Sequence, residues 1–83
     1  MQIILAFNEA EGYAWRNYHN LRGVQVISLD EPHKIDGARI TEVYLTPAAI
    51  GHKNFPYAYH ACARAINQVY GLQEPHPVLK ARR

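Results

Sequence analysis

The chain has 83 residues, of which 48% are hydrophobic and 19% are charged. This length and composition fit one small globular domain and exclude an intrinsically disordered chain. Nine Lys and Arg against seven Asp and Glu give a formal net charge of +2, and three of the cations lie in the last four residues. The positive charge is therefore not spread over the fold as a nucleic-acid-binding patch would be.

The cysteine content and the first residues indicate the compartment. The single cysteine, Cys62, cannot form an intramolecular disulfide, which excludes a small disulfide-stabilised scaffold and favours a reducing compartment. The apolar run at residues 3–7 is too short for a signal peptide or a membrane span and lacks a basic flank. We therefore expect a cytoplasmic protein that does not act at a membrane.

The first two elements are a strand and a helix. Residues 2–7 (QIILAF) form a continuous apolar run, which is typical of a strand buried on both faces. Asn8 then predicts a helix N-cap, because Glu11 follows three positions later and completes a capping box. Glu9 lies in the first turn, where the helix dipole favours a carboxylate.

The spacing of apolar residues predicts how this first helix packs. The face expected to cover the sheet consists of Ala10, Tyr13, Ala14, Asn17, Tyr18 and Leu21. The residues expected to face away are Arg16, His19 and Asn20. Gly12 is the weakest helix former in the segment, and Gly23 is the expected helix stop.

Two further strands follow. Residues 24–29 (VQVISL) and 39–46 (RITEVYLT) predict strands, separated by a polar loop at residues 30–37. We expect the third strand to run parallel to the others, although the short loop also permits an antiparallel strand. Residues 47–56 form a connection that could contain a helical turn at residues 48–50.

A second long helix is predicted at residues 57–70, between Pro56 and Gly71. One apolar stripe consists of Ala58, Ala61, Cys62, Ala65, Val69 and Leu72. A second stripe consists of Tyr59, Ala63, Ile66 and Tyr70. Together they cover an arc of roughly 200°, about twice what a surface helix needs. The second stripe is therefore a candidate interface with a second copy or another protein, and a wider core is the alternative.

This order of elements predicts the fold. Strand, helix, strand, strand and helix form a minimal half-Rossmann-like β-α-β-β-α unit of the α/β class. Its three-stranded sheet should be mainly parallel, with the helices packed on its faces. We expect residues 1–73 to form the domain and residues 74–83, which contain two prolines and the basic end, to form a C-terminal tail.

Two segments carry a resemblance to known proteins. The segments LRGVQVISLD and PHKIDGARITEVYLTP, with the apolar first strand and the Ala-rich closing helix, resemble small uncharacterised α/β proteins encoded by bacteriophages of actinobacteria. The resemblance extends to Leu72 and carries no functional residue across. It implies a host-cytoplasm protein from a compact accessory gene, for which interaction with host machinery is a common role.

Chemistry at the carboxyl ends of the strands is a second hypothesis. Glu9, Asp30 and Glu31 follow the first two strands and could hold a divalent metal for an enzyme. A helix cap at Glu9 and a solvated loop at Asp30 and Glu31 are the simpler interpretation, because short acidic turns are common after strands. In addition, no pair of acidic residues directly follows the third strand at Thr46. The first strand-to-helix turn lacks the glycines of a nucleotide-binding fingerprint. The five histidines lack metal-site spacing and are expected on the surface.

Nucleic-acid binding is a third hypothesis, through the basic end and exposed aromatic residues. The cations concerned are Lys80, Arg82 and Arg83. We favour protein–protein contact, because no Lys or Arg interleaves the aromatic stripe of the closing helix. Cys62 lies on the other stripe and should be a buried hydrophobe and not a nucleophile. The sequence thus predicts a non-enzymatic interaction protein without a cofactor.

Overall fold

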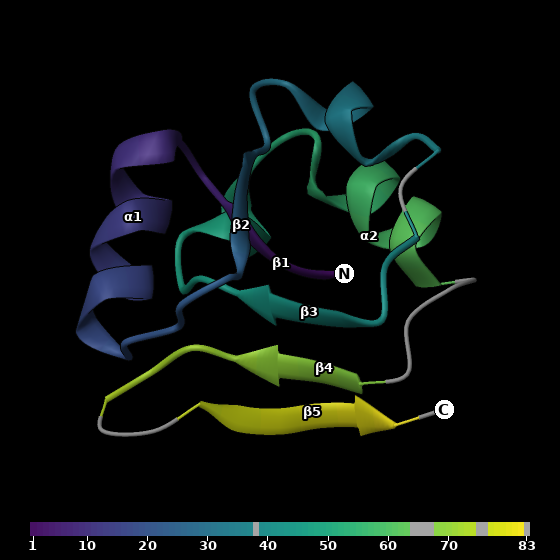
Figure 1. Ribbon diagram of the computed structural model, residues 1–83. Helices are drawn as coiled ribbons and strands as arrows, with labels where there is room; N and C mark the ends of the chain where they lie inside the picture. The colour runs from purple at the N-terminus through teal and green to yellow at the C-terminus, as the bar shows by residue number, and fades with distance from the viewer. Residues whose placement is uncertain (38, 64–67, 75–76, 83) are drawn as a thin grey trace.

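A computed structural model of the protein describes residues 1–37, 39–63, 68–74 and 77–82. In this part of the chain a five-stranded sheet carries two α-helices and two short 3-10 helices (Figure 1). The elements in chain order are β1 (Gln2–Ala6), α1 (Glu9–Tyr18), β2 (Gln25–Ser28), η1 (Pro32–Ile35), β3 (Glu42–Leu45), η2 (Ala49–Gly51), α2 (Phe55–Ala63), β4 (Gln68–Gly71) and β5 (Val78–Arg82). No helix among the described residues is long and apolar enough to cross a membrane.

The strands lie in the order β2-β1-β3-β4-β5. The first four are parallel, and β5 pairs antiparallel with β4. The α/β class is confirmed, and β3 does run parallel to β1. The predicted number of three strands is wrong, because β4 and β5 extend the sheet beyond β3.

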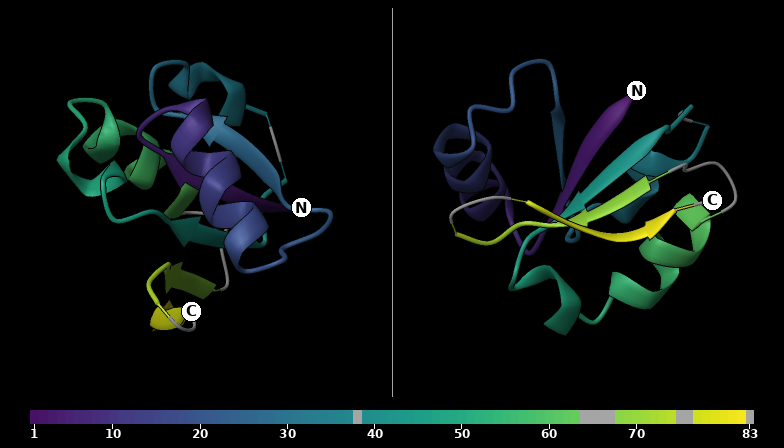
Figure 2. Two further views of the ribbon diagram at one scale, coloured as in Figure 1. Left: turned by 90° about the vertical axis from the view of Figure 1, so that its left-hand side faces the viewer. Right: turned by 90° about the horizontal axis from the view of Figure 1, so that it is seen from below.

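The two helices cover opposite faces of the sheet (Figure 2). Ile3 and Leu5 of β1 point toward α2 and share a core cluster with Cys62. Ile4 and Ala6 point to the other face, in a smaller cluster that Trp15 of α1 covers in part. Both faces of β1 are therefore buried, as its continuous apolar run predicts.

The cap of α1 is confirmed, but the predicted packing face is wrong. The Asn8 side chain accepts a hydrogen bond of 2.8 Å from the Glu11 backbone N–H. Tyr13 and Tyr18, expected against the sheet, are 46% and 54% exposed. Gly12 is the buried residue of the helix, and Trp15, absent from the predicted face, is half-buried against the α1 side of the sheet.

The glycine at position 12 explains this orientation. A Cβ atom built on Gly12 would lie 2.3 Å from Val26 Cγ1 and 2.9 Å from Ala6 Cβ. Both distances are shorter than a van der Waals contact, so only glycine lets the helix backbone come this close to β1 and β2. The helix then ends at Tyr18, five residues before the expected stop at Gly23, and Asn20 has a left-handed backbone with φ 54°.

The second helix is shorter than predicted. It ends at Ala63 within the described residues, and Gln68–Gly71 is strand β4. In a helix, Val69 and Leu72 would share a face; in the structure they belong to core clusters on opposite faces of the sheet. Val69 and Leu72 are three residues apart, and in an extended chain residues at an odd spacing point to opposite faces. Part of the excess apolar arc therefore belongs to a strand, in which Val69 is buried in the core and Tyr70 is half-buried.

The prediction of a C-terminal tail is wrong for residues 78–82. Val78–Arg82 forms strand β5 at one edge of the sheet, with Gly71 opposite Val78 and Gln68 opposite Arg82. The ladder is irregular between Val69 and Tyr70. The prolines and positive charges of this segment suggest a tail, but the segment forms part of the sheet.

Candidate functional site

The carboxyl ends of β1 and β3 meet where doubly wound folds usually bind ligands, because β2 and β3 lie on opposite sides of β1. Here the carboxylate of Glu11 occupies the place that a ligand would take. Glu11 Oε1 accepts hydrogen bonds from the Phe7 backbone N–H at 2.9 Å and the Thr46 hydroxyl at 2.5 Å. Its other oxygen accepts from the Ala48 N–H at 3.2 Å. These donors, which could serve an anion, are taken up by Glu11.

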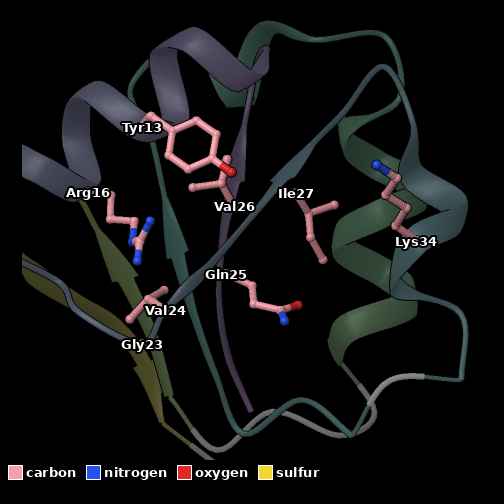
Figure 3. Close-up of a pocket in the computed structure, with 8 residues that line it drawn as sticks. All are labelled: Tyr13, Arg16, Gly23, Val24, Gln25, Val26, Ile27 and Lys34. Atoms are coloured by element: carbon pink, nitrogen blue, oxygen red, sulfur yellow. The ribbon is translucent and has the colours of Figure 1, made fainter.

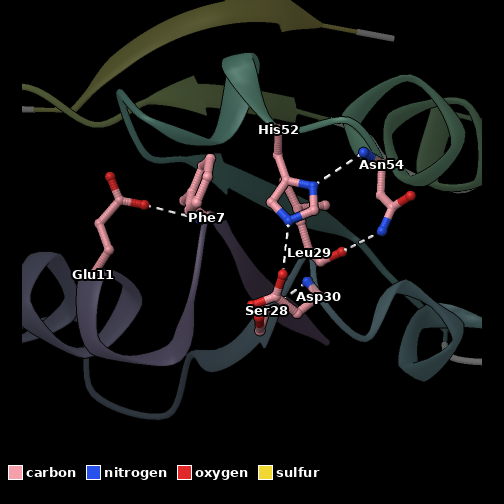
Figure 4. Close-up of polar contacts among 7 residues, drawn as sticks. All are labelled: Phe7, Glu11, Ser28, Leu29, Asp30, His52 and Asn54. Carbon is pink, nitrogen blue, oxygen red and sulfur yellow. Dashed lines mark hydrogen bonds and ion pairs between the residues drawn. The ribbon is translucent and has the colours of Figure 1, made fainter.

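A buried histidine lies beyond the end of β2 (Figure 4). The Asn54 backbone N–H donates to His52 Nδ1 at 3.0 Å, so Nδ1 is an acceptor and the ring proton is on Nε2. That Nε2–H donates to Asp30 Oδ1 at 2.9 Å. The Asn54 side chain donates to the Leu29 carbonyl, and Phe7 packs edge-on against the His52 ring. Both ring nitrogens are therefore engaged in hydrogen bonds, and the cluster joins the segments that follow β1, β2 and η2.

The predicted metal ligands are not brought together as a site. Asp30 is paired with His52, Glu31 lies 3.3 Å from Lys34 Nζ, and Glu9 is exposed in the first turn of α1. Among the described residues, no group of three His, Cys, Asp or Glu side chains is placed to hold a metal ion. The acidic residue that converges on this edge is Glu11, which the sequence marks only as a helix cap.

The histidines differ from the surface pattern expected of them. His33 and His60 are exposed, whereas His52 is buried and His19 is half-buried against Trp15 with a ring distance of 5.6 Å. His76 lies outside the described residues. His52 can be recognised only from its neighbours in space, since the sequence gives it no motif.

Cys62 is buried in the core with 1% exposure, as predicted. Burial raises the pKa of its thiol from 9.0 to about 11. As the pH rises from about 9 toward about 11, the unfolded chain loses this proton while the folded chain keeps it. We expect the free energy of unfolding to fall over this range, and to fall less steeply in Cys62→Ala. Urea titrations at several pH values test this, and equal slopes would contradict it.

The proposed interface stripe is not continuous in the structure. Tyr59 lies on α2 and stacks on Phe55 against the core, whereas Tyr70 lies on β4 and stacks on Tyr44 at 5.0 Å. Ala63 is the last residue of α2, and Ile66 lies outside the described residues. Tyr59 and Tyr70 belong to different elements and do not form one helical face.

The cations proposed for nucleic-acid binding also lie elsewhere than on a tail. Lys80 and Arg82 are positions of strand β5, paired with β4. Arg83 lies outside the described residues.

The free edge of β2 provides a different candidate site. β2 pairs with β1 on one side and, among the described residues, has no strand on its other side. Backbone groups of successive strand residues point alternately to the two sides. The Leu29 N–H donates to the Ala6 carbonyl of β1 at 2.8 Å. The backbone N–H and C=O of Ile27, two residues earlier, therefore also point to β1, while those of Val26 point to the free edge.

A groove of about 520 Å³ runs along this edge (Figure 3). Tyr13 and Arg16 of α1 lie on one side of β2, and Lys34 of η1 lies on the other. The described residues that line it are Tyr13, Arg16, Gly23, Val24, Gln25, Val26, Ile27 and Lys34, and they include two cations and no carboxylate. The groove thus combines an open strand edge with positive charge.

Arg16 is held in place within the groove. Its guanidinium lies 5.8 Å from the centre of the Tyr13 ring, and its Nε donates to the Leu21 carbonyl at 3.3 Å. It forms no ion pair with any residue that the structure describes. The apolar pattern of the sequence predicts that Arg16 faces away from the sheet, whereas the observed rotation of α1 places it in the lining of the groove.

Comparison of the chain with protein-family models, with curated proteins and with solved structures found no match.

Proposed function

We propose that the protein is a non-enzymatic interaction module that binds an extended segment of a partner protein along the free edge of β2. The observation that carries the proposal is the groove beside an unpaired strand edge, centred on Val26. Adding a strand to a sheet edge is a common mode of peptide recognition, in which main-chain hydrogen bonds supply affinity. Each such bond contributes about 1 kcal/mol net.

The surroundings of the edge support binding by a peptide backbone. Helix α1 and η1 stand on opposite sides of β2, and Figure 3 shows the strand crossing the open space between them. Natural edge strands are commonly covered or blocked. At β2 the flanking side chains of Tyr13 and Lys34 leave the edge beside Val26 accessible and form walls for an added strand.

Amide hydrogen exchange provides the test. Peptides selected from a random library against the folded protein should slow exchange of the Val26 N–H and leave the Ile27 N–H, which faces β1, unchanged. N-methylation of the peptide at the positions that face Val26 should abolish the protection, because it removes backbone donors without altering side chains. Failure to select any peptide, or peptides that bind without protecting Val26, would overturn the proposal.

A further inference from the structure

The groove also indicates which segments it would accept. We propose that the segment bound at the β2 edge is acidic and carries two carboxylates three residues apart, one contacting Arg16 and the other Lys34. This inference rests on the proposed function, since it assigns the chemistry of the strand that the edge accepts.

The spacing follows from where the two cations lie. Arg16 belongs to α1, on the face of the sheet that contains Val24 and Val26. Lys34 belongs to η1, whose Ile35 packs on the opposite face with Ile27. Figure 3 shows Arg16 beside Val24 and Lys34 on the far side of Ile27. Val24 and Ile27 are three residues apart, a step that spans about 10 Å of strand and reverses the side-chain face. Residues i and i+3 of an added strand that lie beside Val24 and Ile27 would therefore direct their carboxylates to Arg16 and Lys34.

Charge favours an acidic peptide over a second copy of this chain. The described lining contains two cations and no carboxylate, so pairing two β2 edges would bring four cations together. The neighbouring ion pair does not block the site. Lys34 and Glu31 are about half exposed, with side-chain exposures of 50% and 47%. A surface pair of this kind is weak, and Lys34 can exchange Glu31 for a ligand carboxylate.

Two peptides of identical composition test the spacing. One carries glutamates at i and i+3 and the other at i and i+2, which places both on one face of the strand. We expect the first to bind about threefold more tightly, because one exposed charge pair contributes this much. The difference should shrink at high salt. Equal affinities for the two peptides would overturn the inference.

Charge-removing variants identify the cations. Arg16→Gln and Lys34→Gln should each weaken the i, i+3 peptide about threefold, and the double variant about tenfold. Lys53→Gln, at an exposed position outside the groove, is the matched control and should change nothing. Thermal melts confirm that each variant is folded.

The outcomes separate this inference from the proposed function. Neutral peptides that protect the Val26 N–H as well as acidic ones would leave the proposed function standing and remove the inference. A concentration-dependent dimer that protects Val26 without peptide, or an oligonucleotide that protects it as well as the acidic peptide, would also overturn the inference. If no peptide protects Val26, both proposals fail.

Discussion

Gly12→Ala is expected to lower the free energy of unfolding by about 2 kcal/mol. The added methyl group would lie 2.3 Å from Val26 Cγ1 and 2.9 Å from Ala6 Cβ, so α1 must move away from the sheet or Val26 must leave its rotamer. Overpacking of this kind costs about 1–3 kcal/mol and outweighs the better helix propensity of alanine. For a domain of this size the melting temperature should fall by about 10 °C.

Gly51 offers a matched control for this substitution. A Cβ atom at Gly51 meets no heavy atom within 4 Å, and its backbone is not left-handed. Gly51→Ala should therefore leave stability unchanged or raise it slightly, because alanine restricts the unfolded chain. Chemical denaturation of both variants decides the matter, and equal stabilities would show that close packing of α1 is not required.

Glu11→Gln is expected to destabilise the fold by about 1.5 kcal/mol. The carboxylate accepts hydrogen bonds from the Phe7 N–H, the Thr46 hydroxyl and the Ala48 N–H, and so joins the start of α1 to the segment after β3. An amide has one acceptor oxygen in place of two, and hydrogen bonds to charged groups are stronger than neutral ones. Urea denaturation measures the loss.

Glu9 provides the matched control, since it is an exposed carboxylate in the same first turn. Glu9→Gln should cost only about 0.5 kcal/mol, the value of a charge near a helix N-terminus. A double-mutant cycle with Thr46→Val isolates one contact, because the two effects should be less than additive if Glu11 and Thr46 interact. Additive effects would contradict the link.

The two ends of the chain show why prediction succeeded at one and failed at the other. β1 and the cap at Asn8 depend on a short apolar run and on residues three positions apart, which sequence shows directly. β4 depends on β3, because Leu72 N–H reaches the Leu45 carbonyl at 2.8 Å across a separation that no local pattern reveals. Residues 68–71 fit a helical period, yet the edge of β3 pairs with them as a strand.

The candidate groove could not be predicted for a related reason. Its parts are Arg16 on α1, Val26 on β2 and Lys34 on η1, and only the strand order makes β2 an edge. Arg16 borders the groove because α1 packs through Gly12 and not through its tyrosines. A hydropathy pattern ranks Tyr13 above Gly12 as a core residue. The close approach of the helix backbone to the sheet at Gly12 decides which face of α1 packs inward.

The sequence by itself determined the α/β class, the buried first strand, the cap at Asn8 and the burial of Cys62. Each of these depends on composition or on neighbours within one turn or one strand. Only the tertiary structure decided the rotation of α1, the formation of strand β4 by residues 68–71 in place of a helix, and the free edge of β2. These depend on contacts between distant segments, whose free energy outweighs local preference.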